Sequence, residues 1–175
     1  MILVNAIVLV IPIILLRYPF MSVINKIAFH RAGFFPQTKG KERVAYYIYQ
    51  LTTIFLLFYL IFENIQLKTT YNYIGLILFL IGGLLYMKAI IDFAKPEDNG
   101  LNLRGLYRYS RNPMYVSFFL YFLGCSILIE SLIYFVVLMI FQVSVHFLIL
   151  SEERWCRKNF GQAYEKYKGS VRRYF

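Results

Sequence analysis

Long apolar runs alternate with short basic segments along the chain. The runs cover residues 2–16, 44–62, 73–91 and 114–150. About 20 apolar residues cross the hydrocarbon core of a bilayer as a helix, so each of the first three runs suits one span. The fourth run is long enough for two spans and is interrupted only by Glu130 and Ser131. The pattern predicts an all-α, polytopic membrane helix bundle of about five transmembrane helices, the last two forming a tight helical hairpin.

The two ends of the chain need separate interpretation. The first run is short and contains Pro12, and it extends past Arg17 if that side chain snorkels to the interface. A cleaved signal peptide is the less favoured alternative, because the run lacks a basic start and a small-residue cleavage site. The segment after residue 150 interleaves aromatic with basic residues and is too polar to span. It predicts an interfacial C-terminal helix that is broken or capped around Gly161 and Gly169.

Composition and charge also point to a bilayer. With 59% hydrophobic and 19% aromatic residues, a chain of 175 residues has more apolar side chain than a soluble domain of this size covers. We expect a single integral membrane domain over residues 1–175. The net charge of +10 does not indicate a nucleic-acid partner, because Lys and Arg fall between the apolar runs. With five spans, every Lys and Arg except Lys68 lies on one membrane face, which predicts an outside N-terminus and a cytoplasmic C-terminus.

Residues 105–115, GLYRYSRNPMY, precede the fourth span. Asn112 suits a helix cap and Pro113 suits the first turn, so this span is predicted to begin at Pro113. The free N–H groups of such a helix start attract anions. The arginines and tyrosines that add donors and ring faces are Arg104, Arg108, Arg111, Tyr107, Tyr109 and Tyr115. The equally weighted alternative is that the arginines follow the positive-inside rule and the tyrosines form an interfacial belt.

A second polar cluster ends the fifth span. Glu152 and Glu153 lie on the same predicted face as the arginines, where carboxylates accept hydrogen bonds from sugar hydroxyls or pair with an ammonium group. The alternative is salt bridges to Arg111 or Arg157. Together the two clusters offer donors for a carboxylate, acceptors for a ribose or ammonium, and aromatic rings for a base or a sulfonium cation. That set matches S-adenosylmethionine.

His146 is a third polar feature of the fifth span. It shares a helical face with Gln142 and Glu153, and polar residues within spans usually face the bundle interior and carry function. Hydrogen bonds between helices are the alternative for Gln142 and His146. The sequence contains no metal-ligand spacing, so no metal site is expected.

The two clusters resemble motifs of the isoprenylcysteine carboxyl methyltransferase and phospholipid methyltransferase superfamily of integral membrane enzymes. GLYRYSRNPMY is similar to G-x-Y-x-x-x-R-H-P-x-Y, and EERWCRKNFGQAYEKYKGSVRRYF is similar to E-E-x-x-L-x-x-x-F-G-x-x-Y-x-x-Y-x-x-x-V-x-R. The resemblance covers residues 73–175, a methyltransferase-like core, and leaves residues 1–72 undiagnostic. It implies an S-adenosylmethionine-dependent methyltransferase with its cofactor pocket at the cytoplasmic ends of the last spans. The methyl acceptor it implies is lipophilic, either an isoprenylcysteine-like carboxylate or a phospholipid amine, and enters from the membrane lipids.

The resemblance also implies roles for individual residues. The implied cofactor contacts are Leu101, Tyr107, Asn112, Pro113, Met114, Tyr115 and Glu152. Arg111, Glu153 and His146 are the candidate catalytic residues. An amine acceptor has to lose a proton before it attacks, and Glu153 or His146 is the expected base.

The sequence departs from the family pattern at two positions. Asn112 stands where the family usually has His, which keeps hydrogen bonding but removes a titratable group. Leu148 stands where carboxyl methyltransferases acting on prenylcysteine carry an Arg, which disfavours a prenylcysteine carboxylate. Two less favoured functions are an NADPH-dependent sterol reductase-like activity, suggested by Asn112, and a non-catalytic membrane protein that retains the fold.

Overall fold

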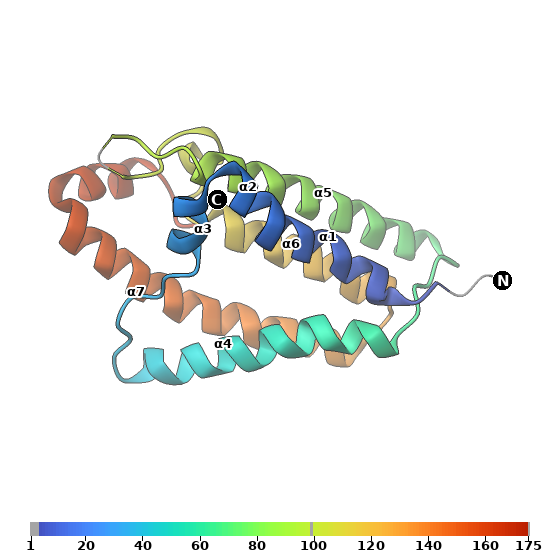
Figure 1. Cartoon of the computed structure of the whole chain (residues 1–175). Coiled ribbons are helices and arrows are strands. Elements are labelled where there is room, and N and C mark those ends of the chain that lie inside the picture. The colour runs from blue at the N-terminus through green and yellow to red at the C-terminus, as the bar shows by residue number, and fades with distance from the viewer. Residues whose placement is uncertain (1–3, 99, 175) are drawn as a thin grey trace.

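The computed structural model describes residues 4–98 and 100–174, and these residues form a bundle of helices that runs back and forth along one axis (Figure 1). The main helices are α1 (Val10–Leu15), α2 (Met21–Ile24), α3 (Lys26–Ala32), α4 (Lys41–Phe58), α5 (Thr70–Phe93), α6 (Pro113–Leu128) and α7 (Leu132–Ser170). Four segments are long and apolar enough to cross a membrane: Ala6–Ile24, Lys41–Phe62, Thr70–Phe93 and Leu132–Ser170. With the shorter apolar α6, they confirm the expected helical membrane bundle and its predicted pass boundaries.

The first pass is a composite of short helices. It joins η1 (Ala6–Leu9), α1, the π-helical turn η2 (Leu16–Phe20) and α2. The widened turn contains Pro19, whose ring and missing N–H do not fit a regular α-helix. The pass extends beyond Arg17 as expected. However, Arg17 does not snorkel outward, because its Nη2 donates to the carbonyl of Ala32 at 2.7 Å.

Glycines bring α5 and α6 into close contact. A Cβ atom at Gly75 would lie 2.7 Å from Cγ2 of Ile127, and one at Gly82 would overlap the backbone of Tyr121. Gly124 of α6 meets the backbone of α5 in the same way. Small residues allow such close helix approach within a membrane, so these two helices form the tightest pair of the bundle.

Residues 129–131 join α6 and α7 through a tight turn. Glu130 adopts a φ of 52°, and the Ser131 side chain caps α7 by accepting a hydrogen bond from the N–H of Tyr134 at 3.2 Å. Beyond this turn the two helices separate, because α6 follows α5 whereas α7 follows α4 (Figure 1). The hairpin therefore keeps its two helices together at the turn and apart at the other end of the bundle, where the first pass ends and the α5–α6 connection lies.

The last turns of α7 leave its axis at Gly161. This residue has a φ of 51° and a ψ of −126°, and the chain beyond it folds back toward the bundle (Figure 1). The predicted break at Gly161 is confirmed, and the helix ends at Ser170, next to Gly169, as also predicted. The tail then reaches the start of α6, where the Arg111 N–H donates to the carbonyl of Arg172 at 3.0 Å.

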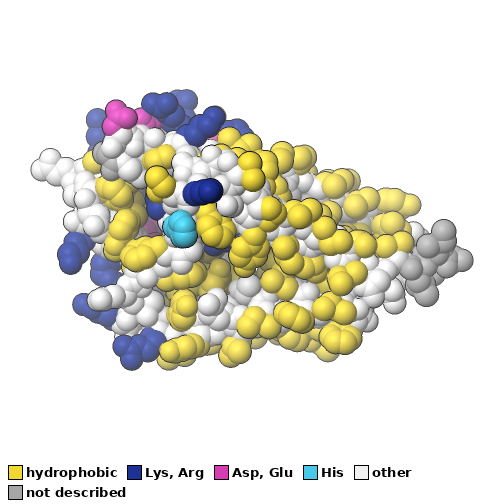
Figure 2. All heavy atoms as spheres, viewed as in Figure 1, with side chains coloured by type: hydrophobic (Ala, Val, Ile, Leu, Met, Phe, Trp, Pro, Cys, Tyr) yellow, Lys and Arg dark blue, Asp and Glu magenta, His cyan; other side chains and the backbone are white. Residues whose placement is uncertain are grey.

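Charged and apolar side chains occupy different parts of the surface. Figure 2 shows Lys and Arg gathered at the end of the bundle that carries the α5–α6 connection and the last turns of α7. Hydrophobic side chains cover much of the remaining visible face. This distribution suits a protein whose apolar belt contacts lipid and whose basic end faces an aqueous phase.

Candidate functional site

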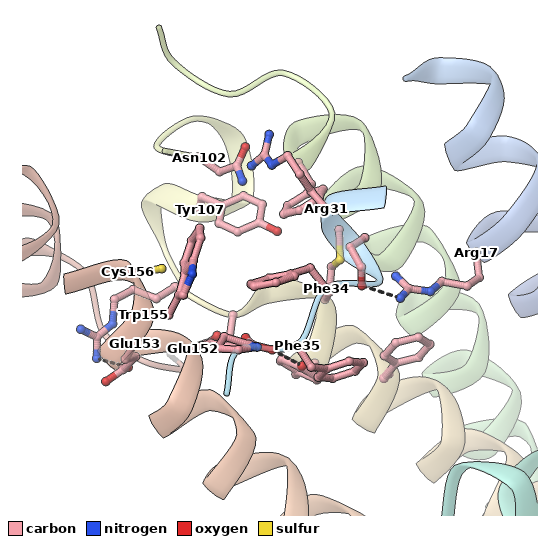
Figure 3. A pocket seen from close by; sticks show the side chains of 18 of the residues that line it. Arg17, Arg31, Phe34, Phe35, Asn102, Tyr107, Glu152, Glu153, Trp155 and Cys156 are labelled. Carbon is pink, nitrogen blue, oxygen red and sulfur yellow. Dashed lines mark hydrogen bonds and ion pairs between the residues drawn. The ribbon is translucent and has the colours of Figure 1, made fainter. Parts of the chain in front are cut away.

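A cavity of about 790 Å³ opens at the basic end of the bundle (Figure 3). It lies where α6 and α7 have separated, and every pass of the bundle contributes to its wall. Most of the cofactor contacts expected from the sequence line it, namely Leu101, Tyr107, Asn112, Met114, Tyr115 and Glu152, together with Arg111 and Glu153. The fold therefore brings together the two polar clusters that lie about 40 residues apart in the sequence.

A direct hydrogen bond joins the two clusters across the cavity. Tyr115, in the first turn of α6, donates from its hydroxyl to Oε1 of Glu152 on α7 at 2.7 Å. The bond spans the two separating helices, so it helps to set the width of the cavity at this level. It also leaves Oε2 of Glu152 able to accept a hydrogen bond from a ligand.

Arg111 is buried and only partly paired. Its Nη2 lies 3.0 Å from Oε1 of Glu153, and the side chains of the two residues are 8% and 7% exposed. The two other nitrogens of its guanidinium, Nε and Nη1, are buried and have no partner among the described residues. Buried donors are nearly always satisfied in native proteins, so these two nitrogens in the cavity wall can donate hydrogen bonds to an anionic or carbonyl ligand.

Glu153 is held by two arginines rather than standing free in the cavity. Arg173 of the tail forms a bidentate pair with it, Nε to Oε1 at 2.8 Å and Nη2 to Oε2 at 2.9 Å. The hydrogen bonds that Arg173 donates to this carboxylate raise the pKa of Arg173. Of the two salt bridges considered in the sequence, the one between Glu153 and Arg111 is present. Arg157 pairs instead with Glu165 at 2.9 Å.

Gly105 and Asp92 position Tyr107. The short helix η4 (Gly105–Arg108) is fixed by Asp92, whose Oδ2 accepts a hydrogen bond from the N–H of Leu106 at 2.8 Å. Gly105 has a φ of 59°, and any Cβ there would overlap the Asp92 carboxylate, so the motif requires glycine. Tyr107 is buried, its carbonyl accepts a hydrogen bond from the Tyr167 hydroxyl at 2.6 Å, and burial raises the pKa of its own hydroxyl well above the ordinary range. Tyr107 is therefore a neutral donor.

The side chain of Asn112 does not cap α6, contrary to the prediction. It occupies the N-cap position, but its side chain makes no capping bond and Nδ2 donates to the carbonyl of Arg173 at 3.0 Å. The side-chain amide of Asn112 thus links the start of α6 to the tail. Pro113 begins the helix as predicted and is buried there, but it does not line the cavity.

His146 also lies apart from the cavity. Its Nδ1 is 2.8 Å from the hydroxyl of Tyr174, and it is absent from the cavity wall. With Arg173 on Glu153, this contact ties the tail to α7 at two points.

The N-terminal half supplies cavity residues that the sequence did not reveal. They include Arg17, Arg31, Phe34, Phe35 and Tyr49, and the start of the polar part of α7 adds Trp155, Cys156 and Phe160 (Figure 3). Arg31 lies 4.7 Å from the ring centre of Phe93, and its Nη2 donates to the carbonyl of Gly100 at 3.3 Å. For Arg17 there was a signal, a charge within an apolar run, but no sequence pattern connects it with the two motifs.

Comparison with known families identifies the same region. A family model described as phospholipid methyltransferase matches residues 70–163, more than half of the chain. The matched segment contains α5, η4, α6 and most of α7, and so carries both polar clusters. The comparison with curated proteins finds no match.

Proposed function

Because the chain belongs to the phospholipid methyltransferase family, we propose that it methylates a lipid amine with S-adenosylmethionine as the methyl donor. The observation that carries this proposal is Arg111, a buried guanidinium in the cavity wall with two nitrogens that have no partner in the part of the chain that the structure describes. We further propose that the N-terminus lies outside and that the cavity opens toward the cytoplasm, since the basic residues gather at that end.

The residues of the cavity fit the parts of S-adenosylmethionine. Its volume of about 790 Å³ lies in the range of small-molecule sites. Nε and Nη1 of Arg111 would hold the carboxylate, and Glu152 would accept hydrogen bonds from the ribose hydroxyls or the ammonium group. The rings of Tyr107 and Trp155 would face the base or the sulfonium. When bound, S-adenosylmethionine supplies a methyl group on a sulfonium that a nucleophile displaces in line.

The protein has little further chemistry to supply. Alignment of donor and acceptor, together with exclusion of water, accounts for much of the acceleration of such a displacement. The apolar residues deep in the cavity and the Tyr115–Glu152 bridge serve these purposes.

For Glu153 and His146 we propose a positioning role in place of the expected proton transfer. Glu153 is committed to Arg111 and Arg173, and His146 to Tyr174. Both contacts tie the tail to α7, and the tail in turn accepts a hydrogen bond from the Arg111 N–H beside the α6 start, which helps to hold Arg111 in the cavity wall. A pH–rate profile unchanged by His146→Gln is expected on this basis, whereas loss of a titrating step would restore the base assignment.

An amine acceptor is favoured over a carboxylate. Leu148, at the position where prenylcysteine carboxyl methyltransferases carry Arg, is fully buried. The family model that matches the chain is also that of phospholipid methyltransferases.

The experiment that tests this function uses S-adenosylmethionine labelled on its methyl group. The purified protein is incubated with phospholipid extract and a synthetic prenylcysteine, and the products are treated with base. Label that stays with lipid is expected for amine methylation, whereas release of volatile labelled methanol would mean a carboxyl methyl ester. Binding of S-adenosylhomocysteine without transfer to any acceptor would support a non-catalytic protein.

A further inference from the structure

Arg17 is a cation placed within the first membrane pass and directed into the cavity (Figure 3). It lies seven residues before the end of the apolar segment Ala6–Ile24, about 10 Å at 1.5 Å per residue. Among the described residues no carboxylate lies within salt-bridge distance of it; its Nη2 donates to the carbonyl of Ala32, and the hydroxyl of Tyr86 also lies beside the guanidinium. Ionisable residues at such depth are costly to bury and typically mark a ligand path.

The wall of the cavity changes from apolar to polar along the bundle axis. The apolar part consists of Ile13, Ile14, Leu57, Phe118, Phe122 and Phe141. On each helix these residues lie farther from the basic end than the polar residue of the same helix: Ile13 before Arg17, Phe122 beyond Tyr115, and Phe141 before Glu152. Toward the basic end the cavity therefore passes from an apolar part to a polar part, which contains Arg17, Tyr115 and Glu152.

Arg17 also stands at the junction of two recesses. A smaller recess of about 320 Å³ lies beside it, and Arg17, Tyr18 and His30 line both this recess and the main cavity. Tyr18 and His30 are exposed, so the smaller recess connects the guanidinium with the surface of the first pass. A headgroup that enters from the side of the bundle meets Arg17 before it meets Glu152.

We propose that Arg17 binds the phosphodiester of a phospholipid acceptor and thereby presents the amine of its headgroup to the methyl donor. Such a lipid has apolar acyl chains that end in a polar headgroup, as the cavity passes from its apolar wall to a polar part where Arg17 can pair with the phosphodiester and Glu152 with the amine. A guanidinium binds phosphate oxygens in a bidentate manner, and a site with low dielectric strengthens that pairing. The inference rests on the proposed function, since it identifies the acceptor of the same site.

The first test measures binding in the absence of methyl donor. Dihexanoyl phosphatidylethanolamine is titrated into detergent-solubilised protein, and Trp155, the single tryptophan and a residue of the cavity wall, provides the fluorescence signal. We expect Arg17→Gln to raise the Kd for this lipid by about tenfold or more, because a charge-assisted, bidentate contact is lost. Arg43→Gln removes an exposed arginine at the same end of the bundle that does not line the cavity, and it should leave the Kd unchanged.

Three further ligands distinguish phosphate binding from other roles of Arg17. Dodecylamine carries the amine without a phosphate, so its Kd should be equal in wild type and Arg17→Gln. S-adenosylhomocysteine should also bind both proteins equally, because Arg111 and not Arg17 is assigned to the cofactor. S-farnesylcysteine presents a carboxylate instead of a phosphodiester, and Arg17 should contribute less to its binding.

Arg17→Lys keeps the charge but not the bidentate geometry of the guanidinium, so it should weaken phosphatidylethanolamine binding several-fold and dodecylamine binding not at all.

Each contrary outcome overturns the proposal in a recognisable way. An unchanged Kd for phosphatidylethanolamine in both Arg17 variants removes its basis. An equal loss of affinity for dodecylamine indicates that Arg17 has a structural role. A loss of affinity for S-adenosylhomocysteine indicates that Arg17 binds the cofactor. An effect confined to S-farnesylcysteine indicates a carboxylate acceptor. Failure of the wild type to bind S-adenosylhomocysteine contradicts the proposed function instead, and leaves the lipid titration informative.

Discussion

Replacing Glu153 by Gln tests whether a buried ion network holds the site together. The Glu153 carboxylate receives Arg111 Nη2 at 3.0 Å and Arg173 Nε and Nη2 at 2.8 and 2.9 Å. Breaking a buried ion pair from one side typically costs about 3–5 kcal/mol, because the other charge stays buried without a partner. The amide oxygen of Gln still accepts one hydrogen bond, worth about 1 kcal/mol. We expect a net loss of about 2–4 kcal/mol in the free energy of unfolding.

The assay is thermal unfolding of the detergent-solubilised protein. For a chain of this length each kcal/mol shifts Tm by about 2–4 °C, so Glu153→Gln should lower Tm by about 4–16 °C. Glu165→Gln is the matched control, because Glu165 pairs with Arg157 at 2.9 Å while both side chains are about half exposed. An exposed pair contributes about 0–1 kcal/mol, so the control should change Tm by only a few degrees at most. Equal Tm values for the two variants would refute the reasoning that the network is buried and structural.

Three further variants test the local geometry. Gly105→Ala should destabilise the protein by about 1–3 kcal/mol, because the new Cβ strains a positive φ and overlaps the Asp92 carboxylate. The control Gly169→Ala, where the helix has open space, should be neutral or stabilising. Equal Tm values for the two variants would contradict this reasoning. Tyr115→Phe removes the 2.7 Å hydrogen bond to Glu152 and should leave the fold nearly unchanged. Isothermal titration should show that S-adenosylhomocysteine binds this variant about tenfold more weakly, and wild-type affinity would argue against the site. Burial raises the pKa of Tyr107, so its contribution to stability is complete below the unfolded pKa of about 10 and is lost as the pH rises from there toward the folded pKa. Tyr107→Phe should therefore gain Tm relative to wild type only above about pH 10, and a constant difference from pH 7 to 11 would contradict the assignment.

The passes of the bundle were predictable from local sequence. Runs of apolar residues report directly on transfer into lipid, and Asn112–Pro113 carries a helix-start signal that depends only on neighbouring backbone. The structure confirms the start of α6 at Pro113 and the break at Gly161. The capping role of Asn112 was wrong, because its side chain makes no capping bond and instead donates to the Arg173 carbonyl, 61 residues away in sequence.

The motifs also indicated much of the candidate site. The sequence indicated both polar clusters, and the structure joins them through Tyr115 and Glu152. The partners of individual groups were not predictable in the same way. Glu153 had two arginine partners available in sequence terms, Arg111 and Arg157, and the structure selects Arg111 together with Arg173 because the tail folds back after Gly161.

The sequence by itself determined that the chain is a helical membrane protein, where its passes lie, and which segments carry the methyltransferase-like chemistry. These properties depend on hydrophobic transfer and on interactions between residues close in the chain. Only the tertiary structure decided that α6 follows α5 and α7 follows α4, which opens the cavity, and that Arg17 from the first pass faces it. These features depend on contacts between distant segments, such as the glycine contacts of α5 with α6, and no local pattern encodes which distant surface a side chain will meet.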